Sequence, residues 1–116
     1  MIETPLPEAA ETATLDRRAS VRYEFSAAAR PAAALSQNRW PARVRDLSSS
    51  GIGLLCERSF DAGRLLTVEL QAPRGETVLL HICVVRSVTQ PGGGWLVGAS
   101  FTEALEAKQL GQLLGT

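Results

Sequence analysis

The sequence contains almost no lysine. Of its twelve basic residues only Lys108 is a lysine, and the other eleven are arginines. Arginine presents a planar, bidentate group that suits phosphates and base edges, although a high genomic GC content produces the same bias. Twelve acidic residues balance the basic ones, and this net charge of zero argues against a general nucleic-acid or membrane-surface binder.

Cysteine, histidine and long apolar runs are also scarce. Cys56 and Cys83 lie in apolar stretches without a CxxC pair, which predicts buried thiols, and His81 alone cannot complete a zinc site with them. No stretch approaches the roughly 18 apolar residues of a membrane-spanning helix, and the acidic N-terminus does not resemble a signal peptide. We therefore expect a soluble cytoplasmic protein that holds no metal and contacts no membrane.

Groups for catalysis are few. A hydrolase would have to use Asp46, Ser48 and His81, but Ser48 lacks a nucleophile elbow and His81 lies in an apolar run typical of a structural imidazole. The glycine-rich QPGGG precedes a strand-like stretch and not a helix, so it is a hairpin turn and not a phosphate-binding loop. The sequence predicts a protein that is not an enzyme.

The length of 116 residues, 45% of them hydrophobic and 21% charged, predicts one domain with one core. Residues 1–15 are rich in proline, glutamate, alanine and threonine, which predicts a disordered tail. Residues 16–26 form an arginine-bearing arm. In this arm Val21, Tyr23 and Phe25 alternate with polar residues, which predicts an extended segment lying against the rest of the domain.

Short stretches with period-two alternation fill residues 27–101. In RLLTVELQA, for example, Leu66, Val68 and Leu70 face one way, and turn sequences such as PRGE separate the stretches. About six short strands with glycine at the corners favour a small closed barrel over an open sheet. A helical period follows at 102–114. We predict an all-β fold: a six-stranded antiparallel β-barrel with a C-terminal α-helix, begun at Thr102, and a flexible N-terminal arm.

Two polar stretches could bind a ligand. Arg18 and Arg22, spaced as RxxxR, place two guanidinium groups on one side of an extended segment, roughly 13 Å apart. A solvated charge run with weak surface ion pairs would look the same in sequence.

The second stretch, DLSSSG, follows an alternating run that puts Asp46 on the same face as Val44. The Asp46 carboxylate can accept two parallel N–H donors, as guanine offers them, and Ser48 can donate to a phosphate or carbonyl oxygen. Gly51 either adopts a positive φ or lets a flat ligand approach the backbone. The alternative is an ordinary Asx/Ser turn, in which both polar side chains bond to their own backbone.

An arginine arm followed by DxSxxG at a strand corner resembles the PilZ domain family. The stretches WPARVRDLSSSGIGLL, ICVVRS and WLVGASF resemble its later strands, so the resemblance covers about residues 16–114. It implies a receptor for cyclic di-GMP with a domain at 16–116: an arm at 16–26, a barrel at 27–101 and a helix at 102–114. It assigns the ligand to Arg17, Arg18, Arg22, Asp46, Ser48 and Gly51.

The resemblance also implies how these residues act. An arginine takes guanine O6 and N7, and Asp46 reads the N1–H and N2–H₂ edge. A basic residue ahead of RxxxR, here Arg17, implies that two ligands bind as an intercalated pair. Binding would order the arm and change the surface shown to an unidentified protein partner in motility, exopolysaccharide production or secretion. The alternative is a ligand-independent interaction adaptor of the same fold. An RNA-binding barrel would need more exposed aromatics as stacking platforms than this chain has.

Overall fold

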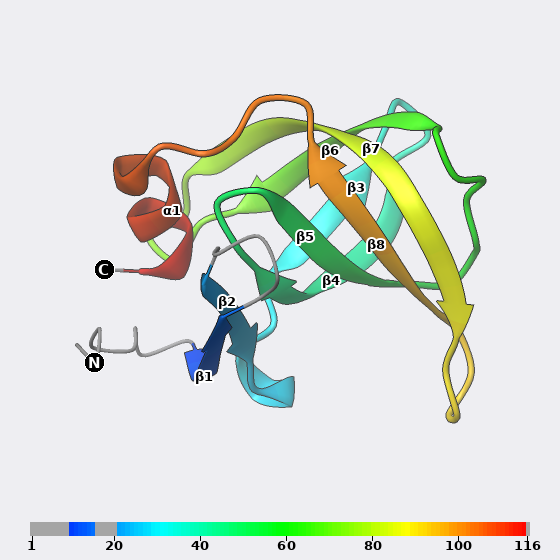
Figure 1. The fold of residues 1–116 in the computed structure, drawn as a ribbon, viewed down its shortest axis with the longest axis horizontal. Coiled ribbons are helices and arrows are strands. Elements are labelled where there is room, and N and C mark those ends of the chain that lie inside the picture. The colour runs from blue at the N-terminus through cyan, green and yellow to red at the C-terminus, as the bar shows by residue number, and fades with distance from the viewer. Residues whose placement is uncertain (1–9, 16–20, 116) are drawn as a thin grey trace.

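The computed structural model describes residues 10–15 and 21–115 (Figure 1). Its elements follow in the order β1 (Ala10–Leu15), β2 (Val21–Phe25), a short 3-10 helix (Ala27–Ala29), β3 (Ala32–Leu35), β4 (Trp40–Leu47), β5 (Gly51–Cys56), β6 (Leu65–Gln71), β7 (Thr77–Thr89), β8 (Trp95–Phe101) and α1 (Ala107–Leu114).

Six strands close into an antiparallel barrel. They run in the order β4–β3–β6–β7–β8–β5, and β5 pairs back with β4. Alternate side chains point inward, and Val44, Leu54, Val68 and Val97 are each at most 1% exposed. The predicted six-stranded barrel is therefore confirmed.

A β-hairpin lies on one edge of the barrel. Its strand β2 pairs with the end of β4 through Tyr23–Leu47 and Glu24–Asp46. Tyr23 is buried, as the alternation predicted. Residues 10–15, which composition placed in the disordered tail, form β1 and pair with β2. Composition missed this strand because a strand forms through backbone hydrogen bonds to a partner. Its partner, β2, lies outside residues 1–15, whose composition was considered.

Other parts of the predicted tail and arm lie outside the described residues. These parts are residues 1–9 and residues 16–20, and the latter carry Arg17 and Arg18.

Helix α1 lies beside one end of the barrel (Figure 1). It is shorter than the predicted 102–114, because its N-cap is Glu106, whose N–H donates to the Gln109 side chain at 3.0 Å. The expected cap, Thr102, instead donates its N–H to the His81 carbonyl at 3.0 Å and so ties the chain to the barrel. The helix buries two side chains in the core, Leu113 and Leu114. No helix in the described ranges is both long and apolar enough to cross a membrane.

Candidate functional site

A β-bulge in β4 decides where Asp46 points. Val44 lies opposite Leu54, but Asp46 lies opposite Gly53, so Arg45 is an extra residue in β4. The bulge turns Asp46 to the outer face, although simple alternation placed it with Val44. That prediction was wrong because two consecutive polar residues give no sign of which one is extra.

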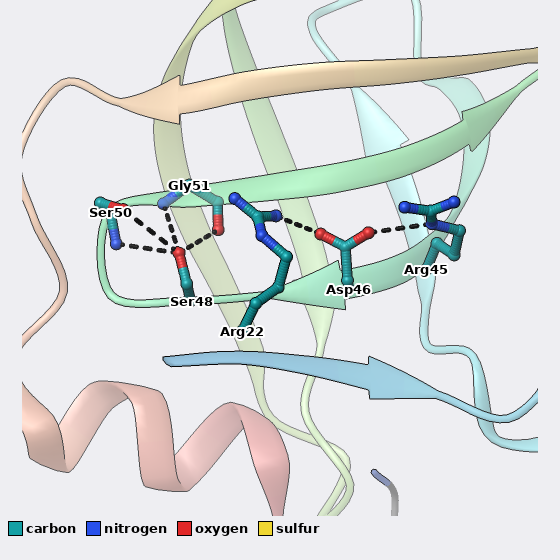
Figure 2. A network of polar contacts seen from close by, with 6 residues as sticks. All are labelled: Arg22, Arg45, Asp46, Ser48, Ser50 and Gly51. Carbon is teal, nitrogen blue, oxygen red and sulfur yellow. Dashed lines mark hydrogen bonds and ion pairs between the residues drawn. The ribbon is translucent and has the colours of Figure 1, made fainter. Parts of the chain in front are cut away.

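The carboxylate of Asp46 is buried even though it lies on the outer face. Arg22 Nη1 donates to one carboxylate oxygen, and Arg45 Nε donates to the other at 2.9 Å (Figure 2). The Asp46 side chain is 2% exposed, and the two arginine side chains are 30% and 37% exposed. The two guanidinium groups offset the cost of burying the charge. Each carboxylate oxygen has about two lone-pair sites, so each can accept a further donor.

A row of four residues, which begins with Asp46, crosses four neighbouring strands. Asp46, Gly53, Gly98 and Arg86 are successive cross-strand partners on β4, β5, β8 and β7. Strands lie about 4.8 Å apart, so the row spans about 14 Å, and its two central positions carry no side chain. A second register shift, at Val85, turns Arg86 outward on β7 just as the first turns Asp46 outward on β4.

This row forms the floor of a groove of about 670 Å³. Three arginines, Arg22, Arg45 and Arg86, line it against the single acid Asp46, which leaves positive charge in excess. Arg86 is exposed and makes no ion pair with any described residue. A groove of this size, with a flat backbone floor and a cationic rim, fits an anionic ligand with a planar part.

The serine turn beside the groove is held by Ser48. Its hydroxyl accepts the N–H of Ser50 at 3.2 Å and the N–H of Gly51 at 3.1 Å (Figure 2). Ser48 is fully buried and does not line the groove, whereas Ser50 does. The Ser48 hydroxyl therefore forms the ordinary serine turn that was the alternative to ligand binding. Asp46 does not follow that alternative, because its carboxylate bonds to arginine side chains.

Gly51 is required by the close approach of two strands. A Cβ at this position would lie 2.7 Å from the carbonyl oxygen of Ala99 on β8. Gly51 does not have a positive φ, so the first of the two reasons expected for a glycine at this position is wrong. The glycine lines the groove and lets β5 pair tightly with β8.

The structure brings only part of the predicted site together. Arg22, Asp46 and Gly51 line the groove, and Ser48 lies beneath the turn. Arg17 and Arg18 fall outside the described residues. The lining residues that sequence reasoning missed include Arg45, Gly53, Gly98 and Arg86. The sequence held a signal for two of these residues. Arg86 ends the VVR stretch, and Gly53 is the glycine at an outward position of GIG.

A second pocket, of about 700 Å³, lies over β3, β6 and β7. Trp40 lines it and packs on Phe60 with ring centroids 5.3 Å apart. The guanidinium carbons of Arg58 and Arg64 lie 4.3 and 5.3 Å from the Trp40 ring. His81 lines this pocket and not the groove, so the hydrolase trio is not assembled. Within the described ranges no cluster of histidine, cysteine and acidic residues could hold a metal ion.

The family model of the PilZ domain matches residues 16–115. The chain belongs to the PilZ domain family. Two solved structures share the fold of this PilZ domain. The inhibitor of motility from Bacillus subtilis (MotI/DgrA) has a TM-score of 0.68 at 17% identity, over 84% of this chain and 48% of that one. The chain thus spans about half the length of that protein.

The second structure is the PilZ domain of YcgR from Escherichia coli with c-di-GMP. It has a TM-score of 0.61 at 16% identity, over 84% of this chain and 86% of that one. A comparison with curated proteins gives no match. At these low identities the two structures are evidence for the fold alone. Any argument for a ligand therefore has to come from the groove itself.

Proposed function

We propose that this PilZ domain is a cyclic di-GMP receptor. The observation that carries the proposal is the row Asp46–Gly53–Gly98–Arg86, which puts a buried carboxylate and an exposed guanidinium at the two ends of a glycine floor. Cyclic di-GMP has two guanines, each with a hydrogen-bonding edge and a flat face, and two phosphate charges. The groove offers a counterpart to each of these features.

Asp46 reads the guanine edge in this proposal. Its two oxygens accept N1–H and N2–H₂ while keeping their bonds to Arg22 and Arg45, since each oxygen has about two acceptor sites. Adenine lacks this pair of donors, so the contact favours guanine by about 1–3 kcal/mol. The arginine bonds also hold the carboxylate still before the ligand arrives.

The arginines meet the rest of the ligand. Arg86, at the far end of the floor, is placed to neutralise a phosphate or to take guanine O6 and N7. Arg18 and Arg17 precede β2, which already carries Arg22 to the groove. We assign them to the second guanine and to a second, intercalated ligand. Ser48 and Gly51 act by shaping the turn beside the bound nucleotide.

Regulation follows from the position of the arm. Strand β2 pairs with β4 at only two positions, one of which is Glu24–Asp46, so ligand bound at Asp46 acts next to the point where the arm joins the barrel. We propose that binding fixes residues 16–20 and thereby alters the surface met by a protein partner. Motility, exopolysaccharide production and secretion are the candidate processes.

Calorimetric titration with cyclic di-GMP, cyclic di-AMP and GTP in parallel tests the proposal. We expect micromolar or tighter binding of cyclic di-GMP, weaker binding of GTP, and at least about fivefold weaker binding of cyclic di-AMP. Equal affinity for the two cyclic dinucleotides would remove the role of Asp46. Absence of binding by all three would leave the ligand-independent adaptor as the better reading.

One observation favours that adaptor as a second candidate. Leu65 and Leu79 are 69% and 62% exposed, and both line the pocket beside Trp40. Exposed aliphatic side chains that line one pocket are typical of protein contact surfaces. The two functions are compatible, because the groove and this pocket share no lining residue.

A further inference from the structure

Gly53 lies directly under the carboxylate of Asp46. The two residues are cross-strand partners, and a Cβ built on Gly53 would lie 2.5 and 2.8 Å from the two carboxylate oxygens. Real Cβ atoms are essentially never found closer than 3.0 Å to a neighbour of this kind. Any side chain at position 53 therefore forces Asp46 to move.

The carboxylate cannot move without losing contacts. It is paired with Arg22 on one side and Arg45 on the other, and these contacts leave Asp46 1% exposed. A displaced carboxylate would break at least one ion pair or leave part of its charge buried without a partner. Residue 53 thus controls the place of the group that we assign to the guanine edge.

Gly98 provides a contrast within the same row. It is the cross-strand partner of Gly53 and also lines the groove. A Cβ on Gly98 would meet only the Arg86 Cγ, at 3.8 Å, which is an ordinary van der Waals contact. Neither glycine has a positive φ, so backbone strain does not separate the two positions. Only the neighbouring carboxylate does.

We propose that Gly53 is a positioning residue that sets the guanine specificity of the groove. By having no side chain it leaves the space over β5 that the Asp46 carboxylate occupies. The inference rests on the proposed function for its ligand, but the steric coupling between residues 53 and 46 is independent of any ligand.

A double-mutant cycle on the ligand-free protein tests the coupling. We expect Gly53→Ala to lower the unfolding midpoint by about 4–8 °C, the shift that corresponds to about 1 kcal/mol in a small domain. In an Asp46→Ala background the same change should cost nothing or raise the midpoint slightly, because the methyl group fills vacated space and alanine restricts the unfolded chain. A Gly53→Ala protein that folds only in that background would be the same result in stronger form. Equal destabilisation in both backgrounds would overturn the inference.

A pair of ligands tests the specificity. Cyclic di-IMP lacks the exocyclic amino group, so the wild-type protein should bind it about 5- to 150-fold more weakly than cyclic di-GMP. Gly53→Ala should reduce this ratio to about threefold or less. Gly98→Ala adds a methyl group to the same floor without touching Asp46, so it should weaken both ligands equally and keep the wild-type ratio.

A wild-type ratio in the Gly53→Ala protein would refute the specificity role. If the wild-type protein bound neither ligand, the proposed function would fail, and the stability cycle alone would still decide whether Gly53 positions Asp46.

Discussion

The groove over the two glycines and the pocket beside Trp40 are nearly equal in size, about 670 and 700 Å³. They differ in the residues that line them and in the net charge of that lining. The groove has two glycines in its floor and three arginines against one aspartate, whereas one arginine and one glutamate balance each other in the lining of the pocket. Volume alone would not choose between them, and our proposal of the groove as the nucleotide site rests on its excess positive charge and its glycine floor.

Both regions also contain arginine–carboxylate ion pairs. In the groove, Arg22 is paired with Asp46, whose side chain is 2% exposed; beside the pocket, Arg39 is paired with Glu69, whose side chain is 29% exposed. An exposed pair of this kind contributes about 0–1 kcal/mol to stability. The buried pair holds a carboxylate in a fixed place, which is what the proposed contact with a guanine edge requires.

The largest effect should come from breaking the buried pair. We expect Asp46→Ala and Arg22→Ala each to weaken cyclic di-GMP binding about 100-fold or more, because the first change removes the bidentate acceptor and the second removes the cation that orients it. Calorimetric titration measures this. Glu69→Ala and Arg39→Ala, the matched changes at the exposed pair, should leave the Kd within about twofold. Similar losses from both pairs would show that the groove is not the site.

Removing the aromatic wall of the other pocket should affect stability and not binding. Trp40→Ala deletes the ring that packs on Phe60 and lies next to two guanidinium groups, so we expect a loss of about 2 kcal/mol in the free energy of unfolding. Urea denaturation measures the loss, and titration checks the Kd. Loss of binding with unchanged stability would move the ligand to the pocket beside Trp40.

The far end of the groove floor should matter less than Asp46. Arg86→Ala should weaken binding about tenfold, since one charge-assisted contact is worth about 1.5 kcal/mol or more. The weakening should shrink at high salt, where the lost Coulomb attraction is screened. Arg58→Ala, which removes an exposed arginine next to Trp40, is the control and should leave the Kd unchanged. An equal effect of the two changes would mean that only the net charge matters.

The smallest effect concerns the two cysteines. Cys83 pairs with Leu65 of the pocket lining on one side and with Ser100 of the groove lining on the other, so its thiol lies between the two regions. Burial raises the pKa of Cys56 from 9.0 to about 11, which keeps that thiol protonated and unreactive at pH 8. A thiol reagent should therefore label Cys83 alone.

Ligand in the groove should slow that labelling by about twofold, because it covers the Ser100 side of the thiol. Mass spectrometry of the labelled protein identifies the site and the rate. Labelling of Cys56 at the rate of Cys83 would contradict the burial of β5, and protection of Cys83 in the Asp46→Ala protein would contradict the placement of the ligand.

Much of the barrel could be predicted because its core follows the simple period of a strand. Val68 and Leu70 are buried at the positions that alternation gave them. The family resemblance also assigned Arg22 and Asp46 to one ligand, and the structure brings these two side chains together. These features depend on residue type at regular spacing, which a sequence displays directly.

The remaining features depend on partners that lie far away in the sequence. The bulge at Arg45 exists only relative to the register of β5, and the need for glycine at position 53 exists only relative to Asp46. Ser48 could donate to a ligand or hold its own turn, and only the positions of the neighbouring N–H groups decide between the two. Strand β1 likewise needs β2 to be visible.

The two bulges have a consequence for how such a groove can arise. Each adds one residue to a strand, Arg45 ahead of Asp46 and Val85 ahead of Arg86, and the residue that follows pairs with a glycine of the floor. Without Arg45 or Val85 the strand would keep plain alternation, and Asp46 or Arg86 would still point outward opposite Gly53 or Gly98. What each inserted residue adds is a second side chain in the lining of the groove, Arg45 at one end of the row and Val85 at the other, while the order of the strands stays the same.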